Sequence, residues 1–291
     1  YISVTGVQTC ALPIFTVGPL MAYFKKRWDD WDFLASATMA GHLLECGAQV
    51  TGGYFSDPGY KDVPNLSHVG FPIVEFDSQG NICVTKPEGS GGIVNRLTVT
   101  EQLLYELHDP AAYLTPDVVA DITAAQIHDL GNDRVQLSGV KGHPKPDCLK
   151  ANICIDGGWL AEAEISYAGH HALERAQLAA QIIRERIGKD LTLRIDFIGS
   201  SSIFASDAGE GPVLNTSNTY EDIRLRVAAA HQDRQLAMRV CREVTALYTC
   251  GPAGGGGVRT SLKPRLNTLV ALIPRAEIKP SYVFYAERDD K

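Results

Sequence analysis

A run of glycines near the end of the chain is the feature best suited to chemistry. Residues 251–259 read GPAGGGGVR. Glycine loses more backbone entropy on folding than any other residue, so such a run marks a close backbone approach or left-handed torsions. A turn of this kind can point several amide N–H groups at one anion, and an arginine adds charge. The run therefore predicts a phosphate or carboxylate site formed by Gly254, Gly255, Gly256, Gly257 and Arg259.

This first glycine loop matches neither common phosphate-binding pattern. A Walker loop needs Gly-Lys-Ser/Thr where this chain has Gly-Gly-Val. A Rossmann loop follows a strand, whereas residues 233–248 have the spacing of a helix, whose C-terminus repels anions. The anion site therefore requires a new helix to begin near residues 260–261, with Pro264 in its first turn. The alternative is a turn that only ends the preceding helix.

A second glycine loop lies at residues 88–95, which read EGSGGIVN. It predicts another anion site, formed by Gly91, Gly92, Asn95 and Arg96, and the alternative is a hairpin or a helix entry. Because an arginine follows each glycine loop, we hypothesise that the two loops line one cleft. Ser200 is a further ligand candidate, because it follows a predicted strand and loops at strand ends are favoured ligand sites; the alternative is a polar turn.

Several side chains are candidates for catalysis. His42 and Cys46 are four residues apart, so on a helix they share a face and suggest a nucleophile and its base. Their alternative is a helix end before a glycine. Glu45 and Asp57 are candidate general acids or bases, with surface carboxylates as the alternative. His108 is a candidate base that also suits a helix C-terminus as a cation.

Two other kinds of site are not predicted. The histidines and cysteines have no recognisable zinc spacing, so we expect no metal site. The chain has no Gly-x-Ser-x-Gly elbow, which argues against an α/β-hydrolase.

Composition narrows the class of protein. The chain has 291 residues, of which 45% are hydrophobic, and a net charge of −7. This length and apolar content suit one large or two modest globular domains. The acidic balance and the short basic clusters argue against nucleic-acid binding. No apolar run is long enough to span a membrane. Seven cysteines are scattered without CxxC pairs, which favours reduced thiols and a cytoplasmic location.

The candidate residues must be positioned by alternating helices and strands. Alternation from about residue 146 onward predicts a layered α/β or α+β unit, a mixed sheet with flanking helices. Asp-Gly-Gly at residues 156–158 predicts a hairpin between two strands. Thr98 and Glu101 predict a capping box. The expected helices are 29–44, 98–107, 170–187 and 233–248, and the expected strands are 71–76, 82–85, 134–138, 150–155, 160–167, 191–198, 223–227 and 282–286.

We predict three parts of the chain. Residues 1–14 include VTGVQTCALPI, which resembles translated sequencing adapter and is expected to be an artefact; the alternatives are a hydrophobic strand or a weak signal peptide. Residues 15–145 form the remainder of an N-terminal and central part, and residues 146–291 form the C-terminal α/β part.

Long segments of the chain resemble the acyclic terpene utilisation AtuA family. The similarity covers about residues 16–287, and family members carry a further N-terminal region, so the resemblance implies that the N-terminal half is incomplete here. The matching segments are WDDWDFLASATMAGHLLECGAQVTGGYFSDPGYKDVP (28–64), FPIVEFD (71–77), KPEGSGGIVN (86–95), LLYELHDPAAYLTPDVVADI (103–122), WLAEAEISYAG (159–169) and LYTCGPAGGGGVR (247–259).

The resemblance implies a bacterial, cytoplasmic catabolic protein. The family is named for catabolism of acyclic terpenes such as citronellol, a route that runs through acyl-CoA thioesters. We therefore expect a ligand that is a branched acyl-CoA or a related carboxylate, with hydration, lyase or acyl-transfer chemistry all open. No cofactor is identified. The alternatives are a non-enzymatic accessory subunit of a neighbouring acyl-CoA enzyme, or an inactive truncated fragment. The expected protein partners are further copies of the chain or an acyl-CoA enzyme.

Overall fold

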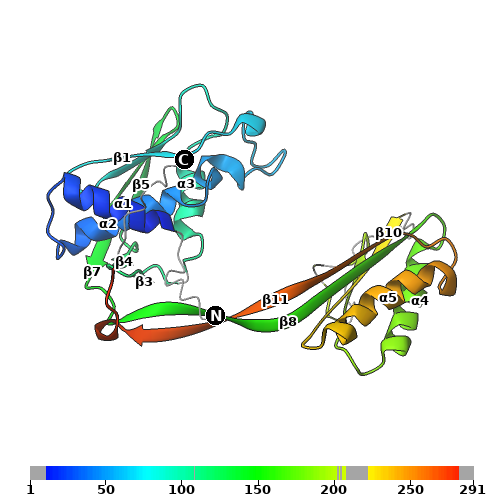
Figure 1. Ribbon diagram of the computed structural model, residues 1–291. Coiled ribbons are helices and arrows are strands. Elements are labelled where there is room, and N and C mark those ends of the chain that lie inside the picture. Colours follow the sequence, from blue (N-terminus) through cyan, green and yellow to red (C-terminus); the bar gives the residue numbers. More distant parts are fainter. Residues whose placement is uncertain (1–10, 108, 202, 204, 208–221, 282–291) are drawn as a thin grey trace, which may run out of the picture. The chain divides into compact units, whose positions relative to one another are not determined.

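The chain folds into two compact units, and the sequence of unit 1 is inserted within that of unit 2. The computed structural model describes residues 11–107, 109–201, 203, 205–207 and 222–281, coloured along the chain in Figure 1. Unit 1 contains residues 153–269, and unit 2 contains the residues before and after it, up to 152 and from 270. The fold is mixed α/β with antiparallel sheets and flanking helices, as the sequence predicts.

Unit 2 packs helices against two small antiparallel sheets. Its helices are α1 (Ala11–Tyr23), α2 (Trp31–Leu44) and α3 (Arg96–Leu104), with a π-helical turn η1 (Gln49–Gly53) and a 3-10 turn η2 (Leu66–His68). One sheet has the order β1-β2-β6-β5 and the other has the order β3-β4-β7. The strands are β1 (Ile73–Phe76), β2 (Ile82–Thr85), β3 (Tyr113–Leu114), β4 (Val119–Asp121), β5 (Gln126–Gly131), β6 (Arg134–Ser138) and β7 (Lys141–His143).

Helix α2 is the centre of unit 2. Its side chains from Phe33 to Leu43 are all buried, so the helix is surrounded rather than amphipathic. Asp30 caps its N-terminus by accepting a hydrogen bond from the Phe33 amide. The helix therefore holds the residues that follow it in a fixed position at the end of a dry core.

Helix α3 begins earlier than predicted. Its cap is Asn95, whose side chain accepts from the amides of Leu97 and Thr98, while the Thr98 hydroxyl accepts from the Asn95 amide. The predicted capping box of Thr98 with Glu101 is therefore wrong, because Asn95 is itself a strong cap three residues upstream.

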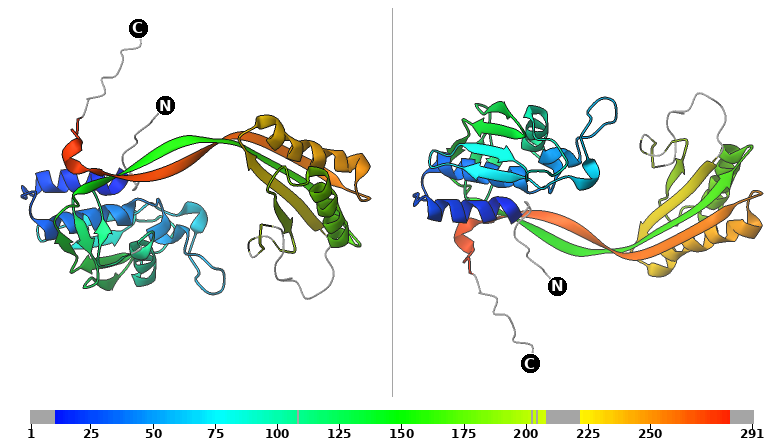
Figure 2. Two further views of the ribbon diagram at one scale, coloured as in Figure 1. Left: turned by 90° about the horizontal axis from the view of Figure 1, so that it is seen from below. Right: turned by 90° about the horizontal axis from the view of Figure 1, so that it is seen from above.

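Unit 1 has the β-α-β-β-α-β order of a split β-α-β, ferredoxin-like unit. Its sheet has the order β11-β8-β10-β9, and the described pairs β8–β10 and β9–β10 are antiparallel. Helices α4 and α5 lie beside each other on one face of this sheet (Figure 2). The elements are β8 (Cys148–Ala168), α4 (Ala172–Ile187), β9 (Arg194–Ile198), β10 (Asp222–His231), α5 (Arg234–Cys250) and β11 (Gly256–Pro274), after which comes the 3-10 turn η3 (Arg275–Glu277).

The predicted hairpin at residues 156–158 is wrong, because β8 runs through it as one strand. Gly158 has φ +76°, and its amide donates to Asp156 Oδ1 at 2.8 Å, so the strand contains a local irregularity instead of a turn. A Cβ on Gly157 would lie 3.0 Å from the Arg265 carbonyl oxygen. The glycines therefore allow a close approach of neighbouring backbone.

No helix begins near residues 260–261, so the condition set for an anion site at the first glycine loop is not met. This segment lies in β11, which occupies the end of the described strand order. Pro264 is compatible with this position because an edge strand tolerates a missing amide donor. The strand expected at residues 282–286 lies outside the described residues.

Candidate functional site

Three of the predicted catalytic residues lie together at the C-terminal end of α2. His42 is fully buried, and its Nδ1 lies 3.6 Å from Glu45 Oε1, whose side chain is only 2% exposed. Cys46 follows directly, and its thiol lies 3.9 Å from the same Glu45 oxygen. The spacing of His42 and Cys46 therefore located a real cluster, in which both residues contact Glu45.

A cavity opens beside this cluster. Its volume is about 320 Å³, and Cys46 forms part of its wall. The cavity is formed where the backbone leaves regular helix, because the π-helical turn η1 contains Gly52 at φ +100°. The lining residues are Cys46, Ala48, Gln49, Gly53, Tyr54 and Val69.

Helix α3 supplies further residues that the sequence did not single out. Gln102 is fully buried, and its Nε2 donates to the His42 carbonyl oxygen at 2.9 Å. Glu106 follows the helix with φ +56°, a conformation that is uncommon for a residue with a side chain. The bond from Gln102 joins residues sixty positions apart in sequence, so local spacing had no signal for it.

Buried polar atoms in this cluster lack hydrogen bonds within the described part of the chain. They are both ring nitrogens of His42, Glu45 Oε2 and Gln102 Oε1. Burying a polar group without a partner costs free energy, and proteins rarely do so in one place. This concentration of unsatisfied groups makes the cluster the candidate functional site.

Electrostatics at the cavity wall favours a protonated thiol. Burial raises the pKa of Cys46 above its usual value, and the nearby carboxylates of Glu45 and Glu106 raise it further, against a lowering hydrogen bond from Gln102. The Glu106 carboxylate is also the main reason that the pKa of Tyr105 is raised. The cavity wall at Cys46 therefore lies in a negative local field.

Comparison with known families agrees with the resemblance seen in the sequence. Residues 9–284 match the family described as acyclic terpene utilisation family protein AtuA. The chain belongs to the AtuA family. This assigns the AtuA-family chain to acyclic terpene utilisation without naming a reaction. No curated protein and no solved structure matches the chain.

In the AtuA-family chain, the first glycine loop lies in unit 1. Gly254 and Gly255 precede β11, Gly256 and Gly257 lie inside it, and Arg259 is an exposed residue of the strand. A Cβ on Gly255 would lie 2.8 Å from Ile165 Cδ1. Close packing on β8 therefore accounts for this glycine, and ligand binding by the loop stays a prediction.

The guanidinium at the first glycine loop belongs to Arg175 of α4. It donates to the carbonyl oxygens of Ala253, Ala168 and His170 at 2.7–2.9 Å. These three acceptors use the planar fork of the arginine to fasten the loop to the start of α4. The sequence pattern pointed to Arg259 because it is adjacent in the chain, whereas the observed contact is long-range.

The second glycine loop lies in unit 2, and its amides already have partners. Gly91 donates to the His68 carbonyl and Gly92 donates to the Pro64 carbonyl, both at 2.8 Å. The amide of Val94 donates to the Asp133 carboxylate, and the amide of Arg96 donates to Asp129. The loop amides do attract carboxylates, but these carboxylates are the protein's own. Binding of an external ligand by Gly91, Gly92, Asn95 and Arg96 stays a prediction.

Asp57 and Ser200 are not among the residues that line the cavity. Asp57 forms a backbone turn with Lys61. The Ser200 amide donates to the Phe197 carbonyl in a turn after β9. His108 lies outside the described residues. The two glycine loops belong to different units, so a shared cleft between them stays a hypothesis.

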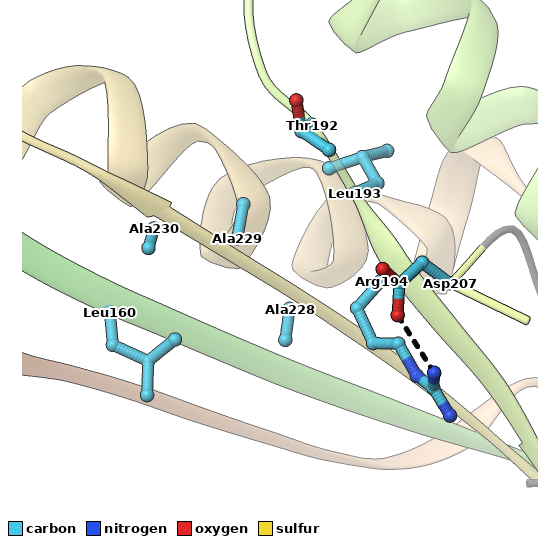
Figure 3. A pocket seen from close by; sticks show the side chains of 8 residues that line it. All are labelled: Leu160, Thr192, Leu193, Arg194, Asp207, Ala228, Ala229 and Ala230. Atoms are coloured by element: carbon cyan, nitrogen blue, oxygen red, sulfur yellow. Dashed lines mark hydrogen bonds and ion pairs between the residues drawn. The ribbon is translucent and has the colours of Figure 1, made fainter.

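Unit 1 has a smaller cavity of about 170 Å³ (Figure 3). Alanines of β10 and Leu160 of β8 give it apolar walls. Its charged members, Arg194 and Asp207, are paired with each other at 2.8 Å. The charged residues that line this cavity therefore satisfy each other, in contrast to the groups behind the Cys46 cavity.

Two kinds of feature do not occur within the described ranges. No group of three or more metal-binding side chains is present there. No described helix has both the length and the apolar composition needed to cross a membrane.

Proposed function

We propose that the AtuA-family chain binds a branched acyl thioester at the Cys46 cavity and catalyses a proton transfer of the hydratase or lyase class. The observation that carries this proposal is the buried His42–Glu45 pair, with unsatisfied polar atoms, directly behind the Cys46 thiol. Membership of a terpene-utilisation family supports a branched hydrocarbon substrate. The family route through coenzyme A thioesters supports the choice of thioester.

The Cys46 thiol is the group placed to carry the proton. Its raised pKa keeps it protonated at neutral pH, so it carries a proton there and is not present as a thiolate nucleophile. In the proposed step, the C–H bond next to the thioester carbonyl breaks as its proton passes to the Glu45 carboxylate, and the S–H bond of Cys46 breaks as the thiol returns a proton to the same carbon. The proton on Glu45 Oε1 then passes to the sulfur 3.9 Å away, which restores both groups.

Acyl transfer is the less favoured of the reactions left open by the sequence. It would need a thiolate nucleophile, and both burial and nearby carboxylates oppose ionisation of Cys46. Hydration and elimination need only positioned proton donors and acceptors, which this cluster supplies. We also propose a cytoplasmic location, which is supported by the six free cysteines among the described residues.

Hydrogen–deuterium exchange tests the proposed proton transfer whichever complete reaction it belongs to. The chain is incubated in D₂O with the citronellyl thioester of coenzyme A, and deuterium next to the thioester carbonyl is measured by mass spectrometry. We expect incorporation by the wild type and a rate at least about 100-fold lower for Cys46→Ala. Cys83→Ala is the matched control, since Cys83 is also a half-buried free thiol of unit 2.

Two results of this assay would contradict the proposal. Exchange at the wild-type rate in Cys46→Ala would remove Cys46 from the reaction. Binding of the thioester, seen as a higher melting temperature, without any exchange would favour the accessory-subunit alternative.

A further inference from the structure

We propose that the Cys46 cavity selects an uncharged oxygen group, a thioester carbonyl or a hydroxyl, and excludes a carboxylate. This inference rests on the proposed function for the location of the ligand. It goes further by naming the charge of the group that enters the cavity. It also divides the expected ligands, because a free acid and its thioester would no longer be equivalent.

The first argument is the composition of the cavity wall. None of the six residues that line it carries a cationic side chain. Proteins that bind carboxylates supply arginine, lysine or several convergent amides for charge-assisted hydrogen bonds. The wall instead supplies a thiol, the Gln49 amide and the Tyr54 hydroxyl, which match a neutral carbonyl or hydroxyl.

The second argument is the charge immediately behind the wall. Glu45 Oε1 lies 3.9 Å from the Cys46 sulfur, and the other oxygen of the same carboxyl group is buried without a partner among the described residues. A ligand carboxylate against Cys46 would therefore approach a second carboxylate, and like charges repel each other.

Third, the lysine that follows the cavity-lining segment in sequence already has partners. Lys61 forms an ion pair with Glu101 at 3.2 Å and lies over the ring of Phe55. A lysine committed to these contacts gives little charge to a ligand at Cys46. Burial is the main cause of the raised pKa of the Cys46 thiol, and the negative charges of Glu45 and Glu106 raise this pKa further.

Protection of Cys46 from alkylation tests the inference with three matched probes. Citronellol, citronellic acid and the N-acetylcysteamine thioester of citronellic acid share one hydrocarbon chain and differ in the charge of the head group. Iodoacetamide labelling of each cysteine in the full chain is followed by mass spectrometry. We expect the alcohol and the thioester to protect Cys46 at concentrations at least about tenfold lower than the acid. The labelling rate of Cys83 should not change with any probe.

Two variants connect the selectivity to its cause. The concentration of acid needed to protect Cys46 exceeds that of the alcohol by a certain ratio. Glu106→Gln should lower this ratio at least about threefold, because it removes one negative charge near the wall. Glu174→Gln is the matched control, since Glu174 is an exposed carboxylate of unit 1, and it should leave the difference unchanged.

Each outcome bears on the inference separately from the reaction. Equal protection by the acid and the alcohol would overturn the selectivity, and so would a lack of protection by all three probes. Protection by the neutral probes alone, without deuterium exchange, would uphold the selectivity while it contradicts the proposed proton transfer.

Discussion

The two units treat buried ionisable groups in opposite ways. In unit 1, Asp196 is 5% exposed and is paired with both Arg194 and Arg226 at 2.7 Å. In unit 2, His42 and Glu45 have side chains buried at least as deeply, and polar atoms of both remain without hydrogen bonds in the described structure. The buried atoms of unit 1 that lack a partner among the described residues are neutral hydroxyls, those of Tyr167 and Ser201. In unit 1 the buried carboxylate of Asp196 is paired and stabilises the fold. In unit 2 the buried Glu45 lies in the proposed site, and one of its oxygens has no hydrogen bond among the described residues.

The two glycine loops look alike in the sequence, and the structure explains both of them by close packing. In unit 1, Gly255 allows the chain to lie against Ile165 and Tyr167. In unit 2, Gly91 allows the chain to lie against the carbonyl of Asn65. Both loops are explained by close packing, so glycine content alone does not distinguish a binding loop from a packed one.

The strongest test of the comparison exchanges the buried acid in each unit for its amide. We expect Glu45→Gln to slow deuterium exchange at least about 100-fold while the free energy of unfolding stays equal or rises by up to about 1 kcal/mol, because a neutral amide replaces a buried carboxyl group whose Oε2 has no hydrogen bond among the described residues. Asp196→Asn should leave exchange unchanged and cost about 1–3 kcal/mol, because two partly exposed arginines lose their partner. Urea denaturation and the exchange assay measure both. The opposite pattern would reverse the assignment of structural and functional charge.

The next test places a methyl group at one glycine of each loop. A Cβ at Gly91 would lie 2.0 Å from the Asn65 carbonyl oxygen, so Gly91→Ala should cost about 1–3 kcal/mol or more and weaken probe protection of Cys46. Val69, which lines the cavity, lies beside this contact. Gly256→Ala meets no atom within 4 Å, so it should change stability by less than about 0.5 kcal/mol. A stable Gly91→Ala protein would show that the loop is not packed as described.

A third test follows the titration of the cavity thiol. The pKa of Cys46 is raised above 9.0, so its alkylation rate should reach half its maximum at a higher pH than that of an exposed thiol, and Glu45→Gln should lower this midpoint. Because the unfolded thiol ionises first, the stability that protonated Cys46 contributes is present below the unfolded pKa and is lost as pH rises through the folded one. Comparison with Cys46→Ala isolates this contribution. An unchanged midpoint in Glu45→Gln would contradict the proximity of the two groups.

The smallest expected effect is the loss of stability when an exposed ion pair is broken. Arg134 lowers the pKa of Glu75, and both side chains are about half exposed. Glu75→Gln should cost less than about 1 kcal/mol. Since the folded pKa is depressed, this contribution is present above the unfolded pKa and is lost as pH falls through the folded one. A larger loss of unfolding free energy in urea denaturation would mean that exposed ion pairs also stabilise unit 2 appreciably.

The sequence predicted the helices whose hydrophobic pattern can be seen within one segment of the chain. The helix expected at 170–187 is α4, and the helix expected at 233–248 is α5, because both bury one stripe at helical spacing. The errors came where distant backbone decides the conformation. Asp-Gly-Gly at 156–158 has the composition of a turn, but β10 and β11 hold it in β8.

The site was predicted in part for the same reason. The spacing of His42 and Cys46 predicted that these two residues share a helix face, and Glu45 was a separate candidate; in the structure both residues contact Glu45. Gln102 and Glu106 come from another helix and its end, and the pattern around them only indicates a capped helix. The unsatisfied state of His42 depends on everything packed around it, which no single segment encodes.

The order of the two units along the chain has a consequence for synthesis. Unit 2 includes residues from both sides of unit 1, and the returning segment is fastened when the Arg275 amide donates to the Asp147 carbonyl at 2.8 Å and its guanidinium donates to the Pro146 carbonyl at 3.1 Å. Domains fold as units while the chain emerges, so the first 152 residues must wait for more than a hundred others before these bonds can form. A ribosome-bound chain halted before Arg275 would therefore carry a nascent unit 2 whose last fastening is still missing.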